Sequence, residues 1–227
     1  MRWRRCKYRR WSVPSLLLVI LVRPALLLDC FVGHLHRHLA WRSVNVAVMG
    51  GPGLVDGEER DEFANFLPCR IEKDGIVYPS AEHFFQAHKT LDQEQRRRIA
   101  ACSFDAVYMA GRRVELRPDW EGVKLRVMLE AAELKYAQNP ELREALLGTR
   151  GEMTFAPSAG FWGVDSLSGR GENWNGRIHA AVRAQLRGDL AEYGRVCEEL
   201  DARSAELRPG AAGRGAAAAA GRGCCGQ

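Results

Sequence analysis

Apolar residues recur at helical spacing through the middle of the chain. Leu125, Met128, Leu129, Ala132 and Tyr136 recur three or four positions apart, which is the pattern of an amphipathic helix. Capping residues and prolines divide the flanking sequence into further helical segments. The expected helices are 80–90, 92–101, 103–111, 119–138, 140–148 and 177–187, and the last of these is expected to be the final helix.

Short runs of β-favouring residues accompany the helices. The Asp74-Gly75 dipeptide separates two such runs and predicts a hairpin. The runs expected to form strands are 44–49, 70–72, 76–78 and 154–155. The segment 50–60 is rich in glycine and acidic residues, and 160–176 is rich in glycine and aromatic residues, so both are expected to be loops.

The two ends of the chain differ in composition from the middle. Residues 1–45 contain nine Lys or Arg and one acid, and their apolar run from Leu16 to Leu28 is broken by Arg23-Pro24. This arrangement is similar to a secretory signal or an organelle presequence, but the run is shorter than the roughly 20 apolar residues of a membrane span. An extension that arises from a misplaced start codon is an equally good alternative. From about residue 201 the chain turns to Arg, Gly and Ala, and the tail is placed at 201–227; its low-complexity part, 208–227, is typical of disordered segments.

These boundaries predict a folded domain over 46–200 between two extensions. The formal charge of the chain is +5, but residues 1–45 carry +8, so the remainder carries −3 and offers no electrostatic reason to bind a phosphate backbone. The seven cysteines are odd in number and lack zinc-type spacing, so we expect free thiols in a reducing compartment and no metal site. The expected location is the cytoplasm. An organelle or a membrane surface is the alternative if 1–45 is a true targeting segment.

One polar face is notable on the helix expected at 80–90. Ser80 follows Pro79 and can cap the helix, which places Glu82 near the positive end of the helix dipole. Glu82, Gln86 and Lys89 are spaced i, i+4, i+7 and share one face beside aromatic residues. Glu82 is a candidate general acid, base or electrostatic partner, and Lys89 is a candidate amine nucleophile or phosphate contact. A surface acid and a solvated lysine are the alternative interpretation.

Three further positions contain groups suited to a ligand. Asn65 lies between two phenylalanines, where its amide could hold a ligand against an aromatic wall, although a simple turn is favoured when this segment is taken alone. Arg112 lies at an expected helix end, where a guanidinium can bind phosphate or only compensate the helix dipole. Trp120 could stack on a base, or it could be a core residue followed by an ion pair between Glu121 and Lys124.

A glycine-rich segment precedes the last expected helix. It contains Trp162, Gly163, Gly169, Gly171 and Asn173. Backbone N–H groups at glycines and at a helix N-terminus can together form an anion cradle. An isolated Gly-x-Gly is a weak signal, but the neighbouring tryptophans and the helix that follows directly strengthen it.

Taken together, these segments resemble the NADAR (YbiA-like) family across about residues 61–188. The matching blocks are Phe63-Ala64-Asn65-Phe66, Tyr78-Pro79-Ser80-x-Glu82-His83, Gln86-Ala87-x-Lys89, Ala110-Gly111-Arg112, Asp119-Trp120-Glu121-x-x-Lys124, Lys135-Tyr136, Leu146-Leu147-x-Thr149, Trp162-Gly163 and Gly169-x-Gly171-x-Asn173-x-x-Gly176. Each block alone would be a weak match, but so many blocks in the same order are not expected by chance.

The resemblance implies a mainly helical α+β single domain with a few short strands that hydrolyses N-glycosidic bonds. The implied substrates are ADP-ribose conjugates such as ADP-ribosylated guanine, free or on a nucleic acid, or ribosyl-phosphate intermediates of riboflavin biosynthesis. Glu82 and Lys89 would be the catalytic residues, and no cofactor or metal is required. The candidate substrate-binding residues are Asn65, Gln86, Arg112, Trp120, Trp162, Gly163, Gly169, Gly171 and Asn173.

Three features depart from the family pattern. The usual aromatic first strand is not evident in 44–49, and Thr154 and Ala159 occupy places where the family typically carries acids. The block that reads Trp-Gly-Asp in the family has an inserted Val164 here. A binding module for ADP-ribose or nucleotides that has lost catalysis is therefore the alternative to a hydrolase. Glu152 and Asp165 could replace the missing acids only if the loop is rearranged.

Overall fold

A computed structural model of the protein describes residues 51–156, 160–165 and 167–209. The chain divides into two units, 1–40 and 41–227, and every described residue belongs to the second. The expected strand at 44–49, the basic segment 1–45 and most of the expected tail at 201–227 therefore lie outside the described residues. The domain boundaries at 46 and 200 stay a prediction.

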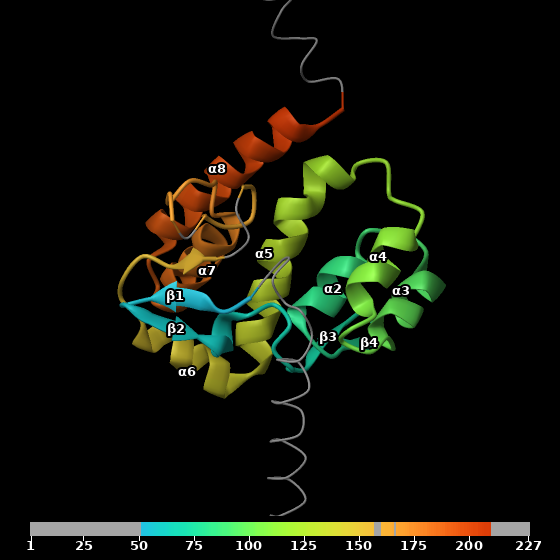
Figure 1. The fold of residues 1–227 in the computed structure, drawn as a ribbon, viewed down its shortest axis with the longest axis horizontal. Helices are drawn as coiled ribbons and strands as arrows, with labels where there is room; N and C mark the ends of the chain where they lie inside the picture. The colour runs from blue at the N-terminus through green and yellow to red at the C-terminus, as the bar shows by residue number, and fades with distance from the viewer. Residues whose placement is uncertain (1–50, 157–159, 166, 210–227) are drawn as a thin grey trace, which may run out of the picture. The chain divides into compact units, whose positions relative to one another are not determined.

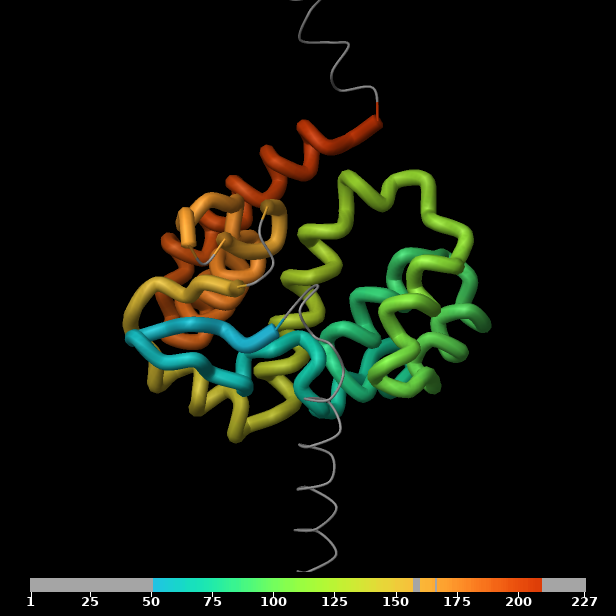
Figure 2. Tube along the Cα trace, in the orientation of Figure 1, coloured from blue at the N-terminus to red at the C-terminus, as the bar shows by residue number. Residues whose placement is uncertain are grey.

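The long helix α5 lies at the centre of the described fold (Figures 1 and 2). Helices α2, α3 and α4 lie on one side of α5, and α7 and α8 lie on the other. The helices are α2 (Ala81–Ala87), α3 (Gln93–Ala100), α4 (Val107–Arg113), α5 (Trp120–Gln138), α6 (Pro140–Gly148), α7 (Trp174–Leu186) and α8 (Leu190–Leu207). The protein is thus mainly helical, with a few short strands, as expected.

Helix α8 corrects the sequence prediction, in which 177–187 is the final helix. Only Val196, Leu200 and Ser204 of α8 are buried, so its apolar stripe is narrow and its sequence is largely charged. Asp189 caps its first turn by accepting a hydrogen bond from the N–H of Glu192 at 3.0 Å. Among the described residues, none of the helices combines the length and the apolar character needed to cross a bilayer.

The strands of the described residues form two small sheets. They are β1 (Gly53–Val55), β2 (Glu58–Arg60), β3 (Ile71–Lys73), β4 (Ile76–Tyr78) and β5 (Thr154–Phe155). The hairpin β3–β4 and the strand at 154–155 confirm the expectation from the sequence. The prediction of a loop over 50–60 was wrong, because β1 pairs antiparallel with β2 and, on its other edge, with β5. Asp56 and Gly57 both have positive φ, as the tight turn of such a hairpin requires.

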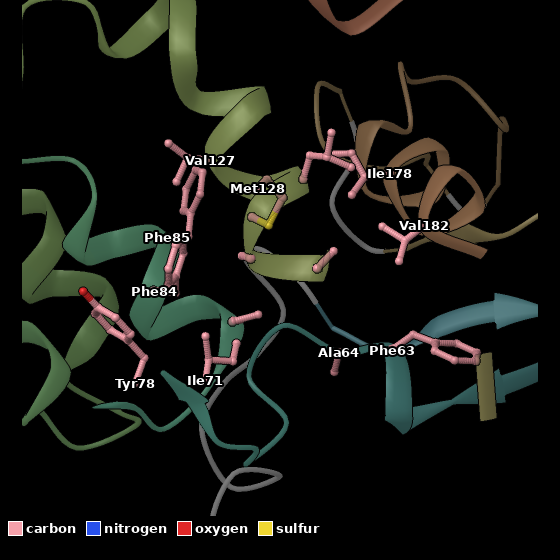
Figure 3. Close-up of a cluster of buried hydrophobic side chains, with 14 of the residues drawn as sticks. Phe63, Ala64, Ile71, Tyr78, Phe84, Phe85, Val127, Met128, Ile178 and Val182 are labelled. Atoms are coloured by element: carbon pink, nitrogen blue, oxygen red, sulfur yellow. The ribbon is translucent and has the colours of Figure 1, made fainter. Parts of the chain in front are cut away.

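Apolar side chains from both groups of helices meet on α5, as Figure 3 shows. Phe84 and Phe85 of α2 lie beside Val127, whereas Ile178 of α7 lies on the other side of Met128. All five side chains are buried, and burying a side chain of this size contributes about 1.5–3 kcal/mol. This packing fixes α2 against α5 and so holds the polar residues of α2 in place. The three described cysteines, Cys69, Cys102 and Cys197, are free thiols.

Candidate active site

Helix α2 begins at the expected cap. The Oγ of Ser80 accepts a hydrogen bond from the N–H of His83 at 3.3 Å and contacts the Nδ1 of that histidine at 2.7 Å. The N–H of Glu82 donates to the carbonyl oxygen of Asn65 at 2.9 Å. The first turn of α2 is therefore attached to the turn that carries Asn65, and its free N–H groups have partners.

The carboxyl group of Glu82 is enclosed by the protein, with only 1% of the residue exposed. The Nε2 of Gln86, which is also buried, donates to its Oε1 at 2.6 Å. Burial raises the pKa of Glu82 to about 7, against the opposing effects of the Gln86 hydrogen bond and the positive charge of Lys89. A carboxyl group with this pKa is about half protonated at neutral pH, so it can either donate or accept a proton.

Gln86 has one carbonyl oxygen without a partner. Its Oε1 is buried and makes no hydrogen bond among the described atoms. A Cβ added to Gly111 of α4 would lie 2.0 Å from this oxygen, so glycine allows α4 to approach α2 at this point. A half-turn of the amide would let Oε1 accept a hydrogen bond from the protonated carboxyl of Glu82. Gln86 can therefore form a hydrogen bond with Glu82 whether the carboxyl group is ionised or protonated.

Lys89 lies at the end of the same face and is half-buried. Its Nζ is 5.8 Å from the ring centroid of Phe85 and 5.9 Å from that of Trp120, within the range of a cation–π contact. Burial lowers the pKa of Lys89, and the nearby Arg112 lowers it further, while Glu82 and Glu121 raise it. The ammonium group is thus the member of the polar face that lies nearest to solvent.

Two tryptophans from distant segments meet on Phe85. The ring centroid of Trp120, at the start of α5, lies 5.1 Å from that of Phe85. The ring of Trp162, from the glycine-rich segment, lies edge-on to Phe85 at 5.3 Å. We call Glu82, Gln86, Lys89, Phe85, Trp120 and Trp162 the Lys89 cluster. It combines an acid near its half-protonation point, a cation and two indole rings.

The remaining predicted residues lie around this cluster with different surroundings. Arg112 is exposed on α4, where its Nη1 lies 3.4 Å from the hydroxyl of Tyr108, and its charge acts on Lys89. The amide of Asn65 is buried and donates to the sulfur of Met128 at 3.6 Å. The structure brings Glu82, Gln86, Lys89, Trp120 and Trp162 together, with Arg112 at the margin. The role of each in binding stays a prediction.

The expected anion cradle is not formed by the amides that precede and begin α7. The N–H groups of Asn173, Trp174 and Asn175 donate to the carbonyl oxygens of residues 163, 161 and 162, at 3.3, 3.3 and 3.0 Å. These donors are occupied within the chain, so the cradle prediction was wrong for them. Their function is to attach the segment that carries Trp162 to the start of α7.

The glycines of this segment are required by its backbone. Gly169 and Gly171 have φ of 66° and 150°, and a Cβ on Gly171 would lie 2.0 Å from the carbonyl oxygen of Gly163. The side chain of Asn173 donates to the carbonyl oxygen of Met153 at 2.8 Å. These contacts shape the loop, and a role for Gly163, Gly169, Gly171 and Asn173 at a phosphate stays a prediction.

The match to a family model decides the affiliation of the chain. The model of the NADAR domain matches residues 55–187, which include every member of the Lys89 cluster. The chain belongs to the NADAR domain family.

Named relatives agree with this assignment. N-glycosidase YbiA of Shigella boydii is 35% identical over 134 residues, which cover 57% of this chain and 83% of that protein. The chloroplastic riboflavin biosynthesis protein PYRR of Zea mays is 31% identical over 156 residues, which cover 60% of this chain but only 25% of that protein. An NMR structure of the Escherichia coli protein YbiA is 34% identical, with a TM-score of 0.48 over 58% of this chain and 81% of that chain.

Glu152 and Asp165 are the candidate replacements for the acids that the family typically carries. Asp165 accepts hydrogen bonds from the N–H and the hydroxyl of Ser168, both at 2.7 Å, and so stabilises its own turn. Glu152 is exposed in the segment before β5. Thr154 lies in β5 opposite Leu54, and Ala159 lies outside the described residues. Among the described residues, the carboxylate of Asp165 accepts only from Leu167 and Ser168 of its own turn.

Two parts of the surroundings of the Lys89 cluster are not predicted from the sequence. Phe161 lies under the ammonium of Lys124, whose Nζ is 4.2 Å from the ring centroid, while Lys124 also pairs with Glu121 at 2.6 Å, as expected. Arg203 of α8 binds Glu172 in the glycine-rich segment. The spacing of 31 residues between these partners leaves no local signal in the sequence.

Proposed function

We propose that the NADAR domain of this protein is a hydrolase that cleaves the N-glycosidic bond of a ribosyl phosphate or an ADP-ribose conjugate. The observation that carries the proposal is the Glu82 carboxyl, held by burial at a pKa of about 7 beside Lys89. A perturbed acid next to a cation and aromatic rings is typical of a reaction centre. The names of its relatives, which include an N-glycosidase, support the same reaction class.

The reaction requires a proton donor and a site for a developing cation. As the bond between the anomeric carbon and nitrogen breaks, its electron pair leaves with the nitrogen, which takes up a proton. The sugar becomes oxocarbenium-like, and water adds to the anomeric carbon and loses a proton. Glu82 would supply the first proton and, once ionised, stabilise the cation and accept a proton from water. The leaving base and the hydroxylated sugar are the products.

Lys89 has two chemical options in this scheme. Its ammonium group can bind a phosphate, together with Arg112. Alternatively, its free amine can add to the aldehyde carbon of the ring-opened sugar product and, with loss of one water, form a Schiff base that water later hydrolyses. Burial lowers the pKa of Lys89 and so increases the fraction of free amine. Because only 1% of Glu82 is exposed, the proposed reaction requires a substrate to approach its carboxyl past Lys89 and the two tryptophans. Trp120 and Trp162 would stack on the base or the ribose.

Two substrate classes fit these groups. A riboflavin biosynthesis protein among the relatives favours phosphoribosylamino-pyrimidine intermediates, and ADP-ribosylated guanine presents the same glycosidic chemistry with a second phosphate. Both contain a ribose joined to nitrogen, a base to stack on indole rings and at least one phosphate. The two differ in the leaving group, which the test below identifies.

The test is product release by the purified full-length chain from each substrate class. We expect free ribose 5-phosphate or ADP-ribose, and at least a 100-fold loss of kcat in Glu82→Gln, since general acid–base catalysis contributes about 10²–10⁴-fold. The matched control is Glu94→Gln. Glu94 is also the second residue of its helix, behind the capping Asp92, but it is exposed. Equal turnover by wild type and Glu82→Gln would remove Glu82 from the mechanism.

Calorimetry with ADP-ribose separates the hydrolase from a binding module that has lost catalysis. Binding together with product supports the hydrolase, whereas tight binding without product from any N-glycoside supports the module. Thr154 and Ala159 at places where the family typically carries acids are the observation behind this second candidate.

A further inference from the structure

We propose that Arg203 of helix α8 is a positioning residue that holds the Trp162 side of the Lys89 cluster in place. This inference rests on the proposed function, because it assigns the cluster to substrate. Helix α8 begins at Leu190, after the last residue of the family match at 187. The proposal therefore extends the functional unit of this chain beyond the segment that the family model matches.

The guanidinium of Arg203 binds Glu172 through two parallel hydrogen bonds. Its Nε donates to one carboxylate oxygen at 2.9 Å and its Nη2 donates to the other at 2.8 Å. The indole N–H of Trp174 donates to the same carboxylate at 2.7 Å. Glu172 is thus held by donors from α7 and from α8, and the planar fork of arginine fixes direction as well as distance.

The contact continues from Arg203 to Trp162 through one aromatic ring. The guanidinium carbon lies 5.9 Å from the ring centroid of Phe161, whose other cation contact is Lys124 of α5 at 4.2 Å. The ring of Phe161 is edge-on to that of Trp162 at 5.0 Å, and Trp162 is edge-on to Phe85 at 5.3 Å. Displacement of Glu172 and Phe161 would therefore move the indole of Trp162, which packs on Phe85 in the Lys89 cluster.

Helix α8 is itself anchored on α5, so Arg203 extends from a fixed support. Arg126 of α5 binds Asp201 with both ends of its guanidinium, and the hydroxyl of Tyr193 donates to Glu133 of α5 at 2.6 Å. Val196 and Leu200 of α8 are also buried. An isolated, partly exposed ion pair contributes little to stability, but a pair that joins an anchored helix to a site loop can control geometry.

The end of α8 also reaches the segment that carries Trp120. A Cβ added to Gly122 of α5 would lie 2.8 Å from the Cγ of Arg208, so glycine leaves room for this side chain to cross the first turn of α5. The charge of Arg208 acts on Asp119, which directly precedes Trp120. One helix therefore contacts the segments of both tryptophans in the Lys89 cluster.

The test compares Arg203→Met with Arg195→Met in the full-length chain. Arg195 lies on the same helix, but its ion pairs, with Glu192 and Glu199, stay within α8. Amide hydrogen exchange is measured at Asn173, Trp174 and Asn175, whose N–H groups attach the Trp162 segment. Steady-state kinetics with the cleaved N-glycoside give kcat and KM separately, and thermal unfolding confirms that the variants are folded.

We expect exchange at these three amides to be at least tenfold faster in Arg203→Met than in Arg195→Met. Misplacing a binding group by about 1 Å can cost up to 100-fold, so kcat/KM should fall roughly 10-fold to 100-fold in Arg203→Met, mainly through KM, because Trp162 binds rather than reacts. Arg203→Lys keeps the charge but lacks the planar guanidinium with its two parallel donors. It should therefore recover part of the lost kcat/KM.

Two results would overturn the positioning role. One is equal amide exchange in the two methionine variants, and the other is an unchanged KM in Arg203→Met despite faster exchange. If wild type cleaves no N-glycoside, the proposed function fails. The exchange experiment then still decides whether Arg203 holds the loop, so the two failures are distinguishable.

Discussion

Replacement of Glu82 by glutamine should change the pH dependence of stability in a defined direction. Burial raises the pKa of this carboxyl from 4.5 to about 7 in the folded protein, while in the unfolded chain it titrates near its ordinary value. Below about pH 4.5 the group is protonated in both states, so its ionisation does not lower the free energy of unfolding. Between pH 4.5 and 7 the unfolded state ionises first, so folding stability falls as the pH rises.

The size of this effect follows from the shift in pKa. One pKa unit corresponds to about 1.4 kcal/mol, so ionisation of buried Glu82 costs on the order of 3 kcal/mol above pH 7. Glu82→Gln removes the titration. Relative to wild type, the unfolding free energy of the variant should therefore rise by about 3 kcal/mol between pH 4.5 and pH 8. The altered contact with Gln86 adds a difference that does not depend on pH and so does not affect this change.

The assay is urea unfolding of wild type and variant at several pH values over this range. The difference between the two proteins cancels the titration of all other groups that the substitution leaves unchanged. Glu94→Gln, which removes an exposed carboxyl from the equivalent position of α3, should show a much smaller change. A difference between wild type and Glu82→Gln that stays constant from pH 4.5 to pH 8 would refute the raised pKa.

Three further substitutions test separate parts of the structure. Burial lowers the pKa of Lys135 to about 8. In urea unfolding, the free energy of unfolding of wild type should therefore rise by about 3 kcal/mol from pH 8 to 10.5 relative to Lys135→Met. A difference between the two proteins that stays constant over this range would contradict the lowered pKa. Gly111→Ala places a Cβ 2.0 Å from the Oε1 of Gln86 and should cost about 1–3 kcal/mol, measured by thermal unfolding, and an unchanged Tm would show that α4 moves freely. Lys89→Met should abolish turnover or raise KM for phosphorylated substrates at least tenfold, and kinetics equal to wild type would exclude Lys89 from the site.

The features predicted correctly from the sequence are those with local causes. Ser80 caps α2 because its hydroxyl lies three residues from the N–H that it accepts from, and Asp74-Gly75 makes a hairpin because only its own backbone is involved. The spacing of Glu82 and Gln86 placed them on one face, and their hydrogen bond spans a single helical turn. Such signals are complete within a few residues.

The missed features depend on partners far away in the chain. Strand β1 is only three residues long, and one of its two neighbours is β5, about a hundred residues later. The prediction of an anion cradle was wrong because it also depended on tertiary contacts. The glycines and the helix start are visible in the sequence, but the carbonyl oxygens of 161–163 that occupy the N–H groups are brought there by the fold.

The position of Glu82 depends on local sequence, whereas its pKa depends on tertiary structure. A carboxylate at the second position of a helix lies at the positive end of the dipole, which by itself favours ionisation. Burial reverses that preference and raises the pKa to about 7. Gly111 lets α4 approach Gln86, the hydrogen-bond partner of Glu82, and Trp120 and Trp162 pack on the neighbouring Phe85. The sequence of α2 places the acid, whereas residues outside α2 set its proton affinity, so loosening any of these contacts should return Glu82 toward an ordinary surface carboxylate.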